Sequence, residues 1–243
     1  RQSGKSIAVV AYLLWYAIFF GEQVVGVLAN KNAIAREMLA RITLMLENLP
    51  FFLQPGCTAL NKGSIGFSNN SRIIAAATSS SSIRGMSLNL VYLDEFAFVE
   101  NASEFYTSTY PVISSGKTSK IIITSTANGI GNMYHKLYEG AVQGTNEFTP
   151  TRVDWWDVPG RDAAWKQMTV ENTSELQFDQ EFGNSFHGTG NTLISADVLL
   201  ALRSTEPQEY YNNVKIFDQP QDGHSYLMFV DVSRGRGQDY STF

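Results

Sequence analysis

The stretch LVYLDE, residues 90–95, places two acidic side chains directly after four residues that are largely apolar. Such a run, set between polar segments, predicts a buried strand. Asp94 and Glu95 would then lie at the point where the strand ends. Because ligands bind at the carboxyl ends of the strands in open α/β sheets, we expect a polar site at this edge.

The first six residues, RQSGKS, end in Gly4-Lys5-Ser6. These three residues match the end of the pattern G-x-x-x-x-G-K-[ST], in which backbone N–H groups and the lysine bind phosphate and the hydroxyl binds Mg²⁺. The first glycine of the pattern would precede Arg1. We therefore expect the chain to be a piece of a longer protein, without the strand that comes before the loop.

The two acids have distinct expected roles, because only one of two adjacent side chains can face a metal ion. Mg²⁺ prefers oxygen ligands and keeps several waters, so Asp94 would hold the ion opposite Ser6. Glu95 would orient or deprotonate the attacking water. The alternative is a solvated acidic turn after a buried strand, which the phosphate-binding pattern upstream disfavours.

A second apolar run, KIIIT at residues 120–124, is followed by hydroxyl and amide side chains. Thr124, Ser125 and Thr126 could hydrogen-bond the γ-phosphate of a nucleotide or its water network. The alternative is a strand with an ordinary turn. Arg1 lies within the phosphate-binding loop, where a guanidinium can stabilise negative charge in the transition state of phosphoryl transfer.

The remaining pattern alternates helices with strands. It predicts a helix over residues 7–20, a strand over 23–28, a helix over 31–47 and a strand over 72–77. Residues 162–183 predict two helices, with Ser174 as the cap of the second. Strands separated by helices favour an α/β fold with a mostly parallel sheet.

The composition is that of a globular chain, since 44% of the 243 residues are hydrophobic and 17% are charged. The net charge of −5 neither supports nor excludes a nucleic-acid partner, because it says little about a local basic groove. Cys57 is the single cysteine, so we expect a packed side chain and a reducing compartment. The longest apolar run, residues 7–20, is too short to cross a bilayer, and we expect no membrane association.

Two polar segments divide the chain, GTGN at residues 188–191 and DQPQDG at residues 218–223. We predict a first domain over residues 1–186, a linker over 187–222, and the start of a second domain over 223–243. The second domain would open with a strand, YLMFVD at residues 226–231, which ends in Asp231.

Together these motifs resemble one family, the large terminase subunit of tailed bacteriophages, which is a DNA-packaging ATPase. The resemblance rests on RQSGKS (1–6), VYLDEFAF (91–98) and TSTANG (124–129). It continues through WWDVPGRDAAWK (155–166), TSELQFDQEF (173–182) and GTGNTLIS (188–195) to FVDVSRGRGQDYSTF (229–243). It implies a P-loop NTPase domain of the RecA/ASCE-like type, with helices flanking a mostly parallel sheet. The first strand of a truncated RNase H-like nuclease domain would follow.

The resemblance also implies roles for individual residues. Arg1 would act on the γ-phosphate, Glu95 would activate water, and Ser6 and Asp94 would bind Mg²⁺. Asp231 and Asp239 would hold divalent metal in the nuclease site, where two ions stabilise the attacking and leaving oxygens. Hydrolysis would be coupled to movement by Thr124, Ser125 and Thr126, and ATP would be bound by these and by Gln2, Ser3, Gly4, Lys5 and Ser6.

For the whole protein, the resemblance implies ATP-driven translocation of double-stranded viral DNA into a capsid, and a metal-dependent endonuclease. The implied partners are DNA, a portal protein, a small terminase subunit and further copies in a ring. The implied location is the host cytoplasm, at the procapsid. By itself, the chain is expected to fold poorly and to hydrolyse ATP weakly or not at all.

Two alternatives stay open. The first is a nucleic-acid helicase or other translocase, which does not need the acids Asp231 and Asp239. The second is a non-catalytic nucleotide-binding scaffold, which would keep Lys5 but tolerate the loss of Glu95.

Overall fold

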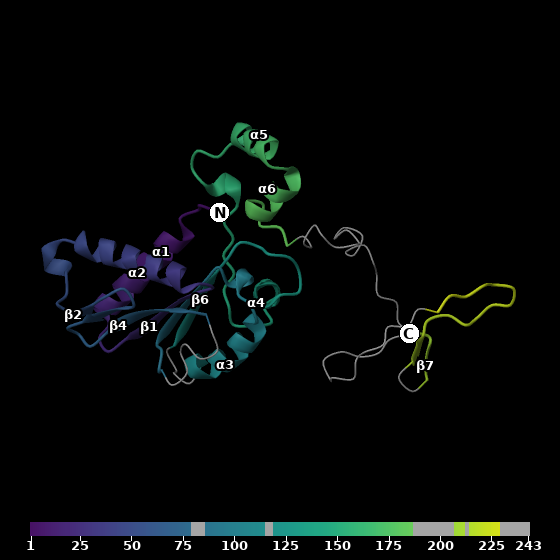
Figure 1. Cartoon of the computed structure of the whole chain (residues 1–243), viewed down its shortest axis with the longest axis horizontal. Coiled ribbons are helices and arrows are strands. Elements are labelled where there is room, and N and C mark those ends of the chain that lie inside the picture. Colours follow the sequence, from purple (N-terminus) through teal and green to yellow (C-terminus); the bar gives the residue numbers. More distant parts are fainter. Residues whose placement is uncertain (79–85, 115–118, 187–206, 212–213, 229–243) are drawn as a thin grey trace. The chain divides into compact units, whose positions relative to one another are not determined.

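The computed structural model describes residues 1–78, 86–114, 119–186, 207–211 and 214–228. The chain divides into two compact units, Arg1–Asp197 and Val198–Phe243. The first unit contains the large sheet and the helices described below (Figure 1).

The large sheet has six strands in the order β2-β3-β4-β1-β5-β6, and its last four strands are parallel. The strands β2 and β3 form an antiparallel hairpin, and β3 pairs antiparallel with β4. This confirms the mostly parallel sheet and the strands predicted near residues 23–28, 72–77, 90–93 and 120–124. The bounds are β1 Val24–Ala29, β2 Cys57–Leu60, β3 Ser64–Phe67, β4 Arg72–Ala77, β5 Leu90–Asp94 and β6 Lys120–Thr124.

Helices cover both faces of this sheet (Figure 1). On one face lie α1 (Lys5–Phe19) and α2 (Asn32–Glu47), which confirms the helices predicted over residues 7–20 and 31–47. On the other face lie α3 (Ala102–Ser114) and α4 (Met133–Val142), which the sequence pattern did not predict. In the part of the chain that the structure describes, every helix is too short or too polar to cross a membrane.

The core consists of one hydrophobic cluster on each face of the sheet. Since successive residues of a strand point to opposite faces, Tyr92 of β5 packs in the cluster beneath α1 and α2, while Val91 and Leu93 pack in the other. Asp94 follows Tyr92 by two residues and therefore shares its face. This alternation directs the acidic end of β5 toward the start of α1.

After α4 the chain forms a small helical lobe, residues 154–183, which contains α5 (Ala163–Asn172) and α6 (Glu175–Glu181). Both helices were predicted, and the Ser174 hydroxyl caps α6 by accepting a hydrogen bond from the Gln177 N–H at 3.2 Å. The lobe has an aromatic core in which neighbouring ring centroids lie 5.2 to 6.1 Å apart. The rings are those of Trp155, Trp165, Phe178 and Phe182.

The described part of the second unit contains a two-stranded ribbon, β7 (Glu209–Tyr211) and β8 (Val214–Ile216). The strand predicted over residues 226–231 is absent from its described part, because residues 226–228 have no regular secondary structure. A strand needs a neighbour for its backbone hydrogen bonds, and no described segment pairs with these residues. Asp231, Asp239 and the GTGN segment lie outside the described residues.

The edge strand β2 corrects one expectation. Cys57, predicted to be packed, is exposed, as are all four residues of this strand. A strand at the edge of a sheet has a neighbour on one side only, and β2 buries no residue on either face.

Candidate active site

The first residues of the chain turn directly into α1, which begins at Lys5. Gly4 caps the helix with a φ of 79°, in the left-handed region where a residue with a Cβ is strained. The first N–H groups of a helix have no partner within it and lie at the positive end of its dipole. This loop and helix start therefore have the geometry of an anion-binding site.

Lys5 is paired with Glu95, ninety positions further along the chain. The Lys5 Nζ donates a hydrogen bond to the Glu95 Oε1 over 2.9 Å, and the two side chains are 23% and 31% exposed. Glu95 itself has a φ of 51°, which is uncommon for a residue other than glycine. The two motifs singled out in the sequence thus meet in space, and the pair stays accessible from outside.

Asp94 lies beneath this pair and is only 2% exposed. Its Oδ1 accepts hydrogen bonds from the Tyr92 hydroxyl and from the Thr124 hydroxyl, each over 2.8 Å. The side chain of Ser6 lies close to the Tyr92 hydroxyl. Burial, followed by the charge of Asp94, raises the pKa of Tyr92 well above its ordinary value. Tyr92 is therefore a neutral hydroxyl that joins the ends of β5 and β6 near the start of α1.

The turn that carries Glu95 is held by the segment after β6. The Ala97 N–H donates to the Ser125 Oγ over 3.1 Å, and the Ala97 carbonyl accepts from the Asn128 Nδ2 over 2.9 Å. Because both backbone groups of Ala97 are fixed, the position of Glu95 is tied to the residues that follow β6. Ser125 thus contacts the acidic turn, as Thr124 contacts Asp94.

Three buried polar atoms gather at the carboxyl edge of the sheet. Among the described residues, the Asn30 Oδ1 after β1, the Thr78 Oγ1 after β4 and the Thr126 Oγ1 after β6 have no hydrogen-bond partner. Buried polar atoms in native proteins nearly always have one. Their position identifies this edge as a place where a polar ligand fits.

A cleft of about 1430 Å³ opens beside residues 1–5, the predicted phosphate-binding loop. Arg1, Ser3 and Lys5 line it from the loop, and residues 119–127 line it from β6. Tyr134 of α4 lines a third side, and its pKa is raised to about 12 by burial, by Tyr138 and by the charge of Glu95. The cleft is large enough for a nucleotide, and it brings the predicted residues Thr124–Thr126 to the same surface as Lys5.

Arg1 contacts the helical lobe. Its side chain forms an ion pair with Glu181 of α6. The backbone carbonyls of Arg1 and Gln2 accept hydrogen bonds from the guanidinium of Arg161, over 3.0 and 3.4 Å. The action of Arg1 on a γ-phosphate remains a prediction, because in this structure its side chain pairs with the lobe.

Sequence reasoning missed Tyr92, Arg161 and Glu181. Tyr92 was counted among the apolar residues of its strand, although its position two residues before Asp94 places it on the same face. Arg161 and Glu181 contact Arg1, about 160 to 180 positions away in the chain, and no local sequence pattern predicts such a contact.

The residues present fit Mg²⁺ only together with a phosphate ligand. Within the described ranges, no group of three or more His, Cys, Asp or Glu side chains could hold a metal ion by itself. Mg²⁺ is, however, usually held by one or two carboxylates together with substrate phosphates and waters. Asp94, with the Ser6 hydroxyl close to its network, matches that kind of site.

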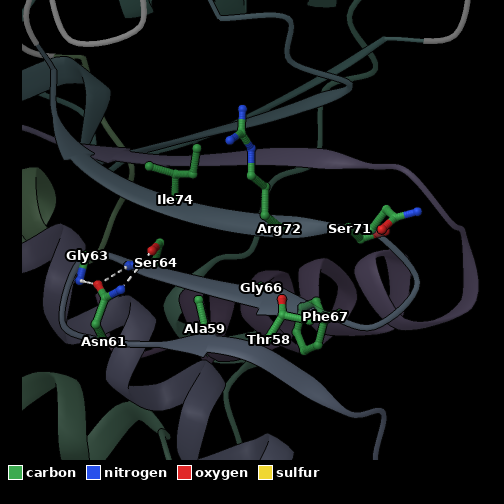
Figure 2. A pocket seen from close by; sticks show the side chains of 11 residues that line it. Thr58, Ala59, Asn61, Gly63, Ser64, Gly66, Phe67, Ser71, Arg72 and Ile74 are labelled. Carbon is green, nitrogen blue, oxygen red and sulfur yellow. Dashed lines mark hydrogen bonds between the residues drawn. The ribbon is translucent and has the colours of Figure 1, made fainter.

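A second hollow, of about 560 Å³, lies on the hairpin side of the sheet (Figure 2). The Asn61 side chain there accepts hydrogen bonds from the N–H groups of Gly63 and Ser64. The one charged residue that lines this hollow is Arg72, and none of the predicted site residues lines the hollow. It offers no acid–base pair, so the cleft beside Lys5 is the candidate active site.

Comparison with known proteins identifies relatives of this chain. Residues 1–200 match the family described as "Terminase large subunit, T4likevirus-type, N-terminal". The chain is 27% identical over 175 residues to the terminase large subunits of Thermus phage G20c and Thermus virus P23-45. Each match covers 66% of this chain and 34% of the relative, so the chain spans about a third of the length of these relatives.

Solved structures share the fold. The large terminase ATPase domain of Thermus phage P74-26 matches with a TM-score of 0.61 at 21% identity, covering 76% of this chain and 85% of that one. The large terminase of bacteriophage HK97 matches with a TM-score of 0.61 at 18% identity, covering 76% and 45%. A large terminase of a thermophilic bacteriophage, solved with ADP, matches with a TM-score of 0.61 at 14% identity, covering 81% and 49%. With the family match over residues 1–200, the chain belongs to the terminase large subunits, in their N-terminal region.

Proposed function

We propose that this chain binds and hydrolyses ATP where the phosphate-binding loop meets the acidic end of β5, beside the cleft. The observation that carries the proposal is the Lys5–Glu95 pair at 2.9 Å, with the buried Asp94 next to it. One edge of the sheet then has Lys5 to bind phosphate, Asp94 to bind the metal and Glu95 to orient water. The names of the relatives, which include an ATPase domain and a complex with ADP, support the same activity.

The residues divide the chemistry among them. Lys5 and the N–H groups of residues 2–6 bind the phosphates, while Ser6 and Asp94 would hold Mg²⁺. When bound, Mg²⁺ neutralises charge on the phosphate oxygens. Lys5 and Glu95 neutralise each other in the structure, so a phosphate that draws Lys5 away leaves the Glu95 carboxylate able to orient water. Arg1 stabilises the γ-phosphate once its contact with Glu181 opens.

The segment after β6 links the bound nucleotide to the position of Glu95. Ser125 contacts the turn that carries Glu95, Thr124 contacts Asp94, and Thr126 has a buried hydroxyl without a partner among the described residues. A nucleotide that offers Thr126 a partner would therefore shift the same segment that fixes Glu95. We assign the coupling of hydrolysis to movement to these three residues.

In the full-length protein, ATP hydrolysis would drive double-stranded viral DNA into a capsid in the host cytoplasm. The motor would be a ring of copies working with a portal protein and a small terminase subunit. We place the ATPase domain at residues 1–186, a linker at 187–222 and the start of a metal-dependent nuclease at 223–243, with Asp231 and Asp239 as metal ligands. The family membership and the length of the relatives support this proposal.

The experiment measures ATP turnover by the full-length protein, with and without double-stranded DNA, for the wild type and for Glu95→Ala. We expect turnover that DNA stimulates and that the substitution abolishes, with ATP binding retained. Wild-type turnover in Glu95→Ala would contradict the role of this residue. ATP binding without turnover in the wild type would favour a non-catalytic scaffold. Unwinding of a forked duplex would instead indicate a helicase.

A further inference from the structure

Arg161 joins the helical lobe to the phosphate-binding loop. Its guanidinium donates hydrogen bonds to the backbone carbonyls of Arg1, over 3.0 Å, and Gln2, over 3.4 Å. The same group lies over the rings of Trp165 and Phe182, at 4.7 and 5.4 Å from their centroids. Arg161 is thus held by the lobe on one side and holds the loop on the other.

The two carbonyl contacts fix the direction of two N–H groups. In a trans peptide the carbonyl of one residue and the N–H of the next point in opposite directions, and the described chain contains no cis peptide. With the carbonyls of Arg1 and Gln2 directed to Arg161, the N–H groups of Gln2 and Ser3 are directed away from the lobe. These are the donors that a phosphate-binding loop needs on its inner side.

The loop has a reason to need this support. Gln2 has a φ of 52°, a backbone conformation that is unfavourable for a residue with a Cβ and persists only when its surroundings hold it. A guanidinium suits the task because its planar donors can serve two carbonyls while its face packs on aromatic rings. The centroids of the Trp165 and Phe182 rings lie 5.2 Å apart, and these rings restrict the position of the Arg161 guanidinium.

We infer that Arg161 is a positioning residue for nucleotide binding, which pre-orients the N–H donors of Gln2 and Ser3 and couples the loop to the helical lobe. The inference rests on the proposed function, because it takes the loop as the phosphate site. When phosphate binds to the loop, the hydrogen bonds between Arg161 and the loop carbonyls change. Because Arg161 belongs to the lobe, this change alters the contact between the lobe and the loop. Arg161 itself touches backbone carbonyls and acts only through them.

Lys166 supplies a matched control within the same lobe. Its Nζ lies 5.2 Å from the centroid of Phe178 and pairs with Glu175 over 2.9 Å, so it combines an aromatic and a polar contact as Arg161 does. Within the described part of the chain, the Lys166 side chain makes no hydrogen bond or ion pair with the phosphate-binding loop. Substituting Lys166 therefore removes contacts within the lobe only. Substituting Arg161 removes contacts within the lobe and also the contacts with the loop.

The experiment uses the full-length protein and measures two quantities, the dissociation constant of a fluorescent ATP analogue with Mg²⁺ and the split of turnover into kcat and KM. For Arg161→Ala we expect the dissociation constant and KM to rise about tenfold, since charge-assisted hydrogen bonds of this kind are lost. The kcat should stay within about twofold. Arg161→Lys, which keeps the charge but not the planar donors, should recover part of the affinity.

The controls separate the possible failures. Lys166→Ala should bind the analogue as the wild type does. Wild-type affinity in Arg161→Ala, or an equal loss of affinity in Lys166→Ala, would overturn the inference while leaving the proposed function intact. A wild-type protein that neither binds nor hydrolyses ATP would overturn both. If Arg161→Ala fails to fold, the conservative Arg161→Lys decides, with unchanged affinity counting against the inference.

Discussion

The two hollows of the sheet differ in how their polar side chains are held. At the edge of the cleft beside Lys5, lining residues contact residues far away in the chain, as Lys5 does Glu95 and Thr124 does Asp94. In the hairpin hollow, Asn61 bonds Gly63 and Ser64, two and three positions away. The first arrangement exists only when α1, β5 and β6 are assembled, whereas the second forms within one turn.

This difference separates activity from local stability. Next to the cleft lies the buried Asp94 carboxylate, which two hydroxyls orient, so substitutions there should act on chemistry. The hairpin hollow is lined mostly by small and polar residues and lies at an exposed edge strand, so substitutions there should act on the packing of that edge. Each prediction below changes one of the two regions.

The largest effect is expected for Lys5→Ala. Loss of the cation removes a preorganised donor for the phosphates and leaves Glu95 unpaired, and such losses reduce turnover by about a hundredfold to a thousandfold. ATP turnover and equilibrium binding of ATP by the full-length protein measure it. Lys120→Ala is the control, since Lys120 lines the same cleft but contacts Tyr12. Comparable turnover in the two variants would mean that Lys5 does not take part in ATP hydrolysis.

A smaller effect is expected for Tyr92→Phe. The substitution deletes the hydroxyl that donates to Asp94 over 2.8 Å but keeps the buried ring. Because hydrogen bonds to charged groups contribute about 1.5 to 3 kcal/mol, the Mg²⁺ concentration for half-maximal turnover should rise about tenfold. Tyr106→Phe, a substitution in the lining of the cleft, should leave this Mg²⁺ concentration unchanged. An unaltered Mg²⁺ dependence in Tyr92→Phe would mean that this tyrosine does not orient Asp94.

The smallest effect on turnover is expected for Gly66→Ala in β3. A Cβ at this position would lie 2.8 Å from the Thr58 Oγ1, so the free energy of unfolding should fall by about 1 kcal/mol. Turnover should not change, because the hairpin carries none of the site. Chemical denaturation followed by circular dichroism measures the stability, and the added substitution Thr58→Ala should restore it. A loss of turnover at unchanged stability would show that the hairpin participates in the activity.

The sequence predicted the elements that carry a clear apolar or amphipathic pattern. Four parallel strands and α1 follow from apolar runs, α2 follows from its amphipathic spacing, and the two lobe helices follow from Ser174 at the break between them. The hairpin was missed because its strands, CTAL and SIGF, have only four residues each, too few to show a pattern. Helix α3 was missed because it is rich in hydroxyl side chains and contains Pro111. The strand predicted over residues 226–231 has no regular secondary structure in residues 226–228, whose side chains are exposed, and its other half lies outside the described residues.

The candidate site was predictable where it follows from chain topology. Lys5 starts a helix, and Asp94 and Thr124 end neighbouring parallel strands in register, so their meeting follows from the order of the elements. The contacts of Arg161 and Glu181 with the loop depend on where a separate lobe docks, and no spacing in the sequence encodes that. The hydrogen bond from Tyr92 to Asp94 lies between these cases, because period-two alternation predicts the shared face but not the bond.

The most direct test of the account is a crystal structure of the full-length protein with Mg²⁺ and a non-hydrolysable ATP analogue. We predict that the Lys5 Nζ leaves Glu95 and contacts phosphate oxygens, and that Mg²⁺ lies between the phosphates, Ser6 and Asp94. Glu95 should then face a water at the γ-phosphate. An analogue bound with the Lys5–Glu95 pair intact, or phosphates placed in the hairpin hollow beside Arg72, would contradict the account.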